Sequence, residues 1–312
     1  MSSFLLFVLL HIPLALAHGY VSRVTVDGTE YVGNPPGHNT SSSPIRMVSS
    51  NGPVQNLSSP FLACGPDAQP AQLEAIAAPG SVINITWVSG GGGNWPHEVG
   101  PVLTYMAECT NTTTCKDFDT TGARWFKIDE AGKQSDNVSW VQLYIEEGRN
   151  FNMTLPENLA PGPYLLRNEI IGLQNAMARG GAEPFPSCTQ LIVTGNGTGV
   201  PAANETVSFP GAYNSTDPGI WFNAYDNTHT PYVFPGPPVA VLINATAAQT
   251  NDTETNNTTA PALDAPSPEK YKLPPSGTPE LDAPSHDGCT EMDATPVLTV
   301  MAARGRIALV EL

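Results

Sequence analysis

The chain has 312 residues, a formal net charge of -16 and only 13% charged residues. This acidic balance disfavours nucleic acid and anionic membrane surfaces as partners and suits a neutral substrate better. With 28 glycines and 31 prolines, the composition favours many turns and short strands over helices.

The chain begins with an apolar run, residues 4–16, that ends in the small-residue pattern Ala15-Leu16-Ala17 accepted by signal peptidases. We therefore predict a signal peptide over 1–17 and a secreted, extracellular product. No later run approaches the length of a membrane span. Cleavage would give His18 a free α-amino group, and its amine and Nδ1 could chelate a metal such as Cu(II). Alternatively, cleavage leaves a histidine there by accident.

The strands expected in the mature chain share alternating or β-branched patterns between turn signals. In chain order they lie at 20–26, 81–88, the end of 94–106, 124–128, 140–144, 150–155, 164–171 and 188–193. Residues 31–75 are rich in Pro, Gly, Ser and Asn and indicate a long loop region. Because no helix periodicity is evident, the pattern predicts an all-β fold, an antiparallel β-sandwich.

Three parts of the chain are expected: the signal peptide over 1–17, a β-sandwich domain over 18–244, and a tail over 245–312. The tail is rich in Pro, Ala, Thr and Asp, which predicts disorder. Its lone Cys289 is either a free thiol or an intermolecular link. Asn-x-Ser/Thr sequons indicate surface loops in a glycosylated product. They include Asn39, Asn84, Asn137, Asn152, Asn214 and Asn257.

Four cysteines precede residue 190, and secretion favours disulfides between them. Cys109 and Cys115 are close enough in sequence to close a local loop. Cys64 and Cys188 would then close a long one, although the sequence alone allows other pairings.

His97 follows a run of four glycines, where a loop becomes a strand. A lone histidine there is either structural or a metal ligand. Six blocks in the same order resemble the auxiliary-activity family 9 lytic polysaccharide monooxygenases. They are residues 16–21, 95–101, 164–171, 186–191, 209–213 and 217–220. The resemblance runs from His18 to about Pro238 and leaves the tail outside.

The resemblance implies a fibronectin- or immunoglobulin-like sandwich whose long loops form a flat face. On that face one copper ion would be held by a histidine brace, with the amine and Nδ1 of His18 and Nε2 of His97. Copper, reduced by an electron donor, would activate O2 or H2O2 and oxidise C1 or C4 of a β-1,4-glucan such as cellulose. We expect a monomer that acts on a polysaccharide surface.

The resemblance also implies the disulfides Cys64–Cys188 and Cys109–Cys115. Tyr213 is either an aromatic of the substrate face that stacks on a sugar ring or a core tyrosine.

Three residues depart from the family pattern around the expected metal. Phe185 stands where the family has an axial tyrosine, and its ring still blocks that position, as in the related family 10. Glu183 replaces a glutamine, and a carboxylate close to copper would stabilise the oxidised cation. Asn168 stands where the family usually has histidine. An amide cannot transfer protons near neutral pH as imidazole does.

Three hypotheses follow. The first is a secreted copper monooxygenase acting on cellulose or a related β-glucan. The second is a secreted copper-binding protein of the same fold that has lost or retuned the oxygenase, which Asn168 and Phe185 motivate. The third is a glycosylated cell-wall β-sandwich without metal, in which His18 and His97 are incidental.

Overall fold

The computed structural model describes residues 18–226 and 230–245. The expected signal peptide, the tail from 246 onward with Cys289, and the sequon at Asn257 lie outside the described residues. In the described part of the chain, no helix is long and apolar enough to cross a membrane.

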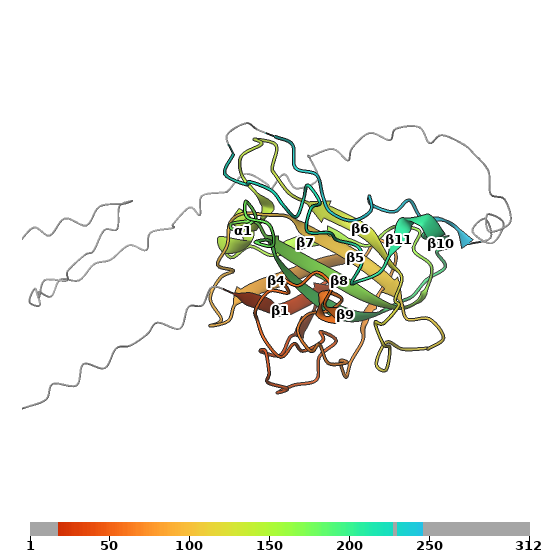
Figure 1. Cartoon of the computed structure of the whole chain (residues 1–312). Helices are drawn as coiled ribbons and strands as arrows, with labels where there is room; N and C mark the ends of the chain where they lie inside the picture. Colours follow the sequence, from red (N-terminus) through yellow and green to blue (C-terminus); the bar gives the residue numbers. More distant parts are fainter. Residues whose placement is uncertain (1–17, 227–229, 246–312) are drawn as a thin grey trace, which may run out of the picture. The chain divides into compact units, whose positions relative to one another are not determined.

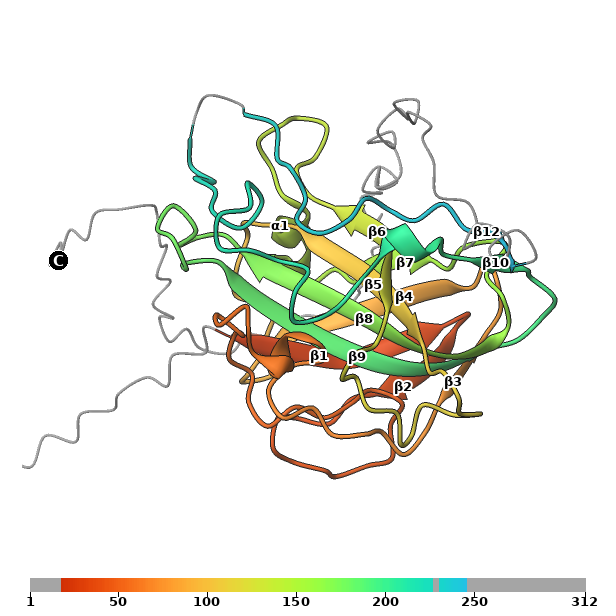
Figure 2. The ribbon, with the colours of Figure 1, turned by 45° about the vertical axis from the view of Figure 1, so that its right-hand side comes forward.

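Two sheets pack as a sandwich, which confirms the all-β prediction (Figure 1, Figure 2). One has the strand order β2-β1-β4-β7, the other β11-β6-β5-β8-β9-β3, and β10 pairs with β12. Among the strands of the described residues, all pairings are antiparallel except that of β3 with β9. The strands are β1 (Gly19–Val26), β2 (Thr29–Val32), β3 (Ala75–Ala77), β4 (Val82–Ser89), β5 (Val102–Glu108), β6 (Trp125–Ala131), β7 (Phe151–Thr154), β8 (Gly162–Gly172), β9 (Glu183–Val193), β10 (Gly199–Val200), β11 (Thr206–Val207) and β12 (Ile243–Asn244).

The prediction of a strand over 140–144 is wrong, because the chain forms the helix α1 (Val141–Glu146) there. The helix buries Val141, Gln142 and Ile145, a spacing that a strand would not give. Two hydrogen bonds of Gln142 favour the helix over a strand here. Its Nε2 donates to the carbonyl of Ile171 at 2.8 Å, and its Oε1 accepts from Trp95 Nε1 at 3.2 Å. Two short 3-10 turns, η1 (Pro60–Leu62) and η2 (Ala203–Glu205), complete the helical elements described.

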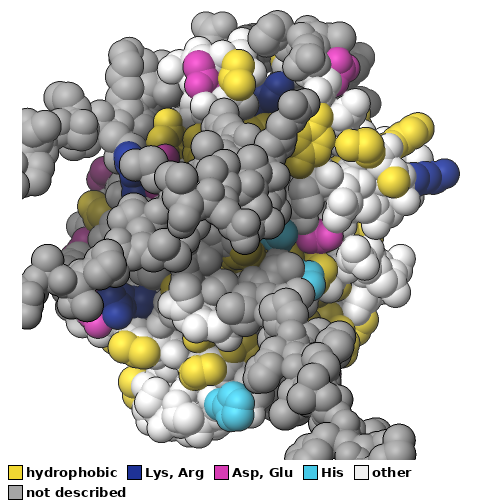
Figure 3. Space-filling model, turned by 90° about the vertical axis from the view of Figure 1, so that its left-hand side faces the viewer, with side chains coloured by type: hydrophobic (Ala, Val, Ile, Leu, Met, Phe, Trp, Pro, Cys, Tyr) yellow, Lys and Arg dark blue, Asp and Glu magenta, His cyan; other side chains and the backbone are white. Residues whose placement is uncertain are grey.

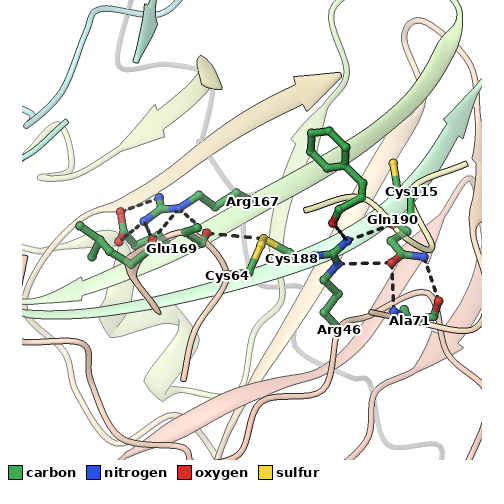
Figure 4. The surroundings of a disulfide bond; sticks show 11 residues. Arg46, Cys64, Ala71, Cys115, Arg167, Glu169, Cys188 and Gln190 are labelled. Carbon is green, nitrogen blue, oxygen red and sulfur yellow. Dashed lines mark hydrogen bonds and ion pairs between the residues drawn. A yellow bond between two sulfur atoms is a disulfide. The ribbon is translucent and has the colours of Figure 1, made fainter. Parts of the chain in front are cut away.

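The strands β8 and β9 are neighbours in the larger sheet, with Asn168 opposite Ser187 and Ile170 opposite Phe185. Because side chains alternate along a strand, Arg167 and Glu169 share one face of the sheet and Asn168 lies on the other. The first face carries a fully buried ion pair, Arg167 Nη2 to Glu169 Oε1 at 2.6 Å, beside the Cys64–Cys188 disulfide (Figure 4).

The structure joins Cys64 to Cys188 and Cys109 to Cys115, the pairing that the family resemblance implied. The first bond ties the loop before β3 to β9, and Arg46 on the same loop donates to the side chain of Gln190 at 3.3 Å (Figure 4). The long loop region is therefore held against the larger sheet at several points.

Two sequons do not lie in loops as expected. Asn84 is in β4 and Asn152 is in β7, and they are direct cross-strand partners. Asn39, Asn137 and Asn214 are exposed residues outside the strands.

Candidate metal centre

His18 directly precedes β1, at the end of the smaller sheet. Its carbonyl oxygen accepts a hydrogen bond from the backbone N–H of Gly90 at 2.7 Å and another from Asn51 Nδ2 at 3.2 Å. The next residue must be glycine, because a Cβ on Gly19 would clash with the carbonyl oxygen of Val88. These contacts hold the backbone of His18 close to the end of β4.

His97 lies in the loop between β4 and β5, and the buried Trp95 positions it. The rings of Trp95 and His97 are 5.5 Å apart in an edge-to-face arrangement. Trp95 is itself fixed by its hydrogen bond to Gln142 on α1 and by edge contact with Trp87 at 5.5 Å. The helix that the sequence did not predict therefore supports the loop of His97.

Phe185 on β9 brings the two histidines together. Its ring centroid is 5.9 Å from that of His18 and 6.3 Å from that of His97. Trp95 packs edge-on against the same phenyl ring at 5.0 Å. Phe185 is only 3% exposed, so it forms a nonpolar base beneath both imidazoles. The structure thus places three of the expected site residues in one cluster.

The donor set fits copper under one condition. Among the described residues, no group of three or more His, Cys, Asp and Glu side chains could hold a metal ion. Two imidazoles therefore need a third donor, which a free α-amino group on His18 would supply. Three nitrogen donors suit Cu(II) better than other divalent ions of the first transition row. Figure 3 shows histidine side chains reaching the surface beside hydrophobic and acidic ones.

Glu183, the first residue of β9, lies two positions before Phe185, and two amides hold its carboxylate. Its Oε2 accepts from Gln174 Nε2 at 2.6 Å and its Oε1 accepts from Asn175 Nδ2 at 3.1 Å. The Gln174 Oε1 atom is buried and accepts no hydrogen bond within the described part of the chain. No local sequence pattern marks Gln174 or Asn175, because only the β8–β9 hairpin brings them to the carboxylate of Glu183.

Asn168 does not face the histidines. Its Oδ1 accepts from Trp87 Nε1 at 2.9 Å and its Nδ2 donates to Thr104 Oγ1 at 2.9 Å. The side chain is 2% exposed and bridges β8 to β4 of the opposite sheet and to the neighbouring β5. We therefore correct the expectation that its amide faces the metal: Asn168 supports Trp87, which in turn packs on Trp95.

Tyr213 is a core residue, which corrects its expected place on the substrate face. It is 6% exposed, and its hydroxyl donates to Glu169 Oε2 at 2.6 Å. The ring packs edge-on against Phe209 at 5.1 Å. Burial and the neighbouring carboxylate of Glu169 raise the pKa of the Tyr213 hydroxyl well above its usual value. A sugar ring cannot reach this side chain.

A groove of about 360 Å³ is lined in part by the two residues that follow His97 in the sequence. Glu98 and Val99 form one wall, and Trp140 and Tyr225 contribute aromatic rings. Its lining also includes the charged side chains of Lys133 and Asp226.

Residues 18–232 match the family model described as "Auxiliary Activity family 9 (formerly GH61)". AA9 family lytic polysaccharide monooxygenase D from Gloeophyllum trabeum is 52% identical over 244 residues, covering 78% of this chain and 70% of the relative. A second relative from that fungus, AA9 family lytic polysaccharide monooxygenase A, is 40% identical over 235 residues, covering 72% of each chain.

Solved structures with similar folds agree. A cellulose-active polysaccharide monooxygenase from M. thermophila has a TM-score of 0.64 and 34% sequence identity, covering 72% of this chain and 100% of that one. The extended catalytic domain of LPMO9A from H. jecorina also has a TM-score of 0.64, at 30% identity, covering 71% of this chain and 90% of that one.

Proposed function

The chain belongs to Auxiliary Activity family 9, and on that premise we propose that it is a secreted copper monooxygenase that cleaves cellulose or a related β-1,4-glucan. Membership of the family implies copper-dependent oxidative cleavage of a polysaccharide. The observation that carries the assignment to particular residues is the convergence of His18 and His97 on the ring of Phe185. The cellulose activity in the name of the M. thermophila protein supports the choice of substrate.

His18 and His97 would hold the copper ion. After removal of residues 1–17, His18 supplies the α-amino nitrogen and Nδ1, and His97 supplies Nε2. Gly90 and Asn51 fix the backbone of His18, so the chelating amine is oriented before the metal binds. Such preorganisation reduces the conformational entropy that metal binding would otherwise remove.

Bound by His18 and His97, copper would supply redox chemistry between Cu(II) and Cu(I), with which O2 plus two electrons and two protons, or H2O2 alone, could convert a C1–H or C4–H bond to C–OH with release of water. The donated electrons come from a small reductant or a redox partner. The hydroxylated carbon would then become a carbonyl as its bond to the glycosidic oxygen breaks, and the hydroxyl proton would pass to that departing oxygen.

The surrounding residues shape this site in two ways. Phe185 occupies the space beneath the imidazoles with a ring that offers no ligand atom, so it keeps water and side-chain oxygens away. Glu183 brings a carboxylate held in one orientation by Gln174 and Asn175. A fixed negative charge near a cation stabilises the more highly charged ion, and this favours Cu(II) over Cu(I).

Copper titration of the secreted, processed protein tests the assignment of the ligands. We expect one tightly bound Cu(II) per chain. Inserting one alanine before His18, so that the amine belongs to another residue, should weaken binding more than about 100-fold, as should His97→Ala. His38→Ala alters an exposed histidine in a loop and is the matched control. Unchanged affinity in the extended protein would overturn the brace.

A second hypothesis is that the protein binds copper but has lost or retuned its monooxygenase activity. The side chains around Glu183 are amides, which do not transfer protons near neutral pH. Incubation of the copper-loaded protein with several β-glucans, ascorbate and H2O2 separates the two readings. Oxidised oligosaccharides support the monooxygenase, and their absence at full copper loading supports the copper-binding protein.

A further inference from the structure

A pocket of about 360 Å³ lies within the long loop region and shares no lining residue with the cluster around Phe185. Two stretches of that region line it, residues 34–47 and 69–72. Among the described residues that line it, none carries a charge, whereas the groove beside His97 includes Lys133 and Asp226. Amides and hydroxyls predominate, and these groups donate and accept hydrogen bonds as sugar hydroxyls do. The lining therefore suits an uncharged, hydroxyl-rich ligand.

The two stretches that form the pocket are fixed to each other and to the larger sheet. The backbone N–H of Gln69 donates to the carbonyl of Met47 at 2.8 Å. Figure 4 shows Gln190 of β9 beside Ala71, where its Oε1 accepts from the N–H of Ala71 at 3.0 Å and its Nε2 donates to the carbonyl at 3.1 Å. A pocket formed in advance binds a ligand without the entropic cost of ordering its walls.

Asn39 belongs to the lining and is also the acceptor residue of the sequon Asn39-Thr40-Ser41. It is exposed, and the chain that follows it is held by Asn34, which is only 7% exposed. Asn34 Oδ1 accepts from the N–H groups of Thr40 at 3.0 Å and Ser41 at 2.9 Å. A buried side chain thus fixes the loop around Asn39, and a group attached to Asn39 would begin at the edge of the pocket.

Part of the lining is apolar. Ile45 is buried, Met47 is half-buried and Pro70 is exposed. N-acetylglucosamine, the first sugar of an N-linked glycan, carries an acetyl methyl group and apolar C–H faces in addition to its hydroxyls and its amide. A pocket that combines apolar side chains with amides and hydroxyls matches both kinds of surface, and its volume is in the range of pockets that hold small ligands.

We propose that Asn39 carries an N-linked glycan whose first N-acetylglucosamine occupies this pocket. The inference rests on the proposed function only for secretion, because the modification takes place in the secretory pathway. In the transfer, Asn39 Nδ2 forms a bond to C1 of a lipid-pyrophosphate-linked oligosaccharide. The bond from C1 to the pyrophosphate oxygen breaks, the lipid pyrophosphate leaves, and Nδ2 loses one proton. Because the sugar is tethered beside the pocket, its binding is intramolecular and needs little affinity.

Release of the glycan by a peptide:N-glycosidase tests the site on the secreted, glycosylated protein. Mass spectrometry follows each sequon separately, because the enzyme leaves aspartate in place of the glycosylated asparagine. In the folded protein, release from Asn39 should be at least about 10-fold slower than in the reduced, unfolded protein. Asn152 and Asn214 are exposed residues outside the lining of this pocket, and glycans on them should be released at nearly equal rates in both forms.

A variant that keeps the sequon probes the pocket itself. Gln69→Ala removes an exposed side chain from the lining and should raise the release rate at Asn39 in the folded protein about 3- to 10-fold. Gln55→Ala is the matched control, because Gln55 is an exposed glutamine of the same loop region outside the lining. Equal acceleration by both variants would show that the pocket does not hold the sugar.

Three further results would overturn the proposal. They are equally fast release from Asn39 in the folded and unfolded protein, an unmodified Asn39 beside glycans at other sequons, and a protein without N-glycans. The last of these would also contradict secretion. Copper titration and glucan oxidation do not enter the measurement, so a failed monooxygenase assignment would leave the rates unchanged.

Discussion

Gln174 donates from Nε2 to Oε2 of Glu183 across 2.6 Å, and this contact joins the two ends of the loop that connects β8 to β9. Nine residues separate the partners in sequence. The other amide atom of Gln174, Oε1, is buried without a hydrogen-bond partner among the described residues. Gln174 therefore binds the Glu183 carboxylate through its Nε2, while its Oε1 remains able to accept a hydrogen bond.

This asymmetry predicts different results for the two partners. In Glu183→Gln the amide of Gln174 can rotate and accept through Oε1, so the free energy of unfolding should change by less than about 1 kcal/mol. The loss of a negative charge should raise the copper reduction potential. Gln174→Leu leaves a carboxylate oxygen without its donor and should cost about 1.5–3 kcal/mol.

Chemical denaturation and potentiometry of the copper-loaded protein measure these two effects. Gln72→Leu, a substitution at an exposed glutamine, is the control for stability. A larger loss of stability in Glu183→Gln than in Gln174→Leu would contradict this account of the pair.

Because the ring of Phe185 packs against both histidines, we expect its removal to lower both stability and copper affinity. Phe185→Ala removes the ring that contacts both histidines and Trp95 and should cost about 3–5 kcal/mol of stability, as for other buried phenylalanines. Copper affinity should fall because the imidazoles lose their base. Phe185→Tyr preserves the ring and should bind copper nearly as tightly. Titration and electron paramagnetic resonance check both variants, and copper affinity in Phe185→Ala equal to that of Phe185→Tyr would argue against this role.

Asn168 predicts a structural defect rather than a gain of activity. Asn168→Leu leaves Trp87 Nε1 and Thr104 Oγ1 buried without their partners, so it should cost about 1–3 kcal/mol for each group left unsatisfied. Asn168→His should also lose stability and should not increase oxidised products per bound copper. Denaturation curves together with product analysis decide this, and a large gain in product from the histidine variant would show that Asn168 acts at the metal.

Buried tyrosines predict loss of stability in alkali. Burial, nearly complete for Tyr105, Tyr164 and Tyr213 and partial for Tyr232, raises the pKa values of these hydroxyls above their usual value. Because the folded state holds these protons more tightly, the stabilisation is complete below the unfolded pKa of about 10 and is lost as pH rises above it. Each tyrosine should contribute a slope of about 1.4 kcal/mol per pH unit there.

Denaturant unfolding between pH 8 and 11.5 measures the slope. Tyr213→Phe should make it shallower by the share of one tyrosine. Comparing that variant with the wild type removes the contributions of Lys127 and Arg46, whose pKa values are lowered mainly by burial and which act in the opposite direction. An equally steep fall in the variant would rule out Tyr213 as a contributor.

The two disulfides should differ in their effect on stability. Cys64 and Cys188 are 124 residues apart and Cys109 and Cys115 are 6 apart. In the loop-entropy description, the long link contributes about 5 kcal/mol and the short one about 2 kcal/mol. Paired serine substitutions at each bond, compared by chemical denaturation, measure the difference. The reverse order would mean that local strain or packing outweighs the entropy of the unfolded chain.

Local patterns were enough to predict most of the fold. Alternating residues identified the strands now seen as β1, β4, β8 and β9, because alternation reports directly which face of a strand is buried. The helix α1 was missed since a six-residue segment carries too little periodicity, and long-range hydrogen bonds from Gln142 decide its conformation.

The sequence by itself also provided the two candidate ligands, His18 from the predicted cleavage signal before it and His97 from the resemblance of its surrounding residues to the family. Only the tertiary structure decided what surrounds them. In the folded chain Phe185 packs against both imidazoles, Asn168 lies between the sheets and Tyr213 is buried. The fold also brings Gln174 to Glu183 and leaves Trp221 exposed at the surface. The physical reason is that side-chain direction and hydrogen-bond partners depend on strand register and loop packing between residues far apart in the chain, which no local pattern encodes.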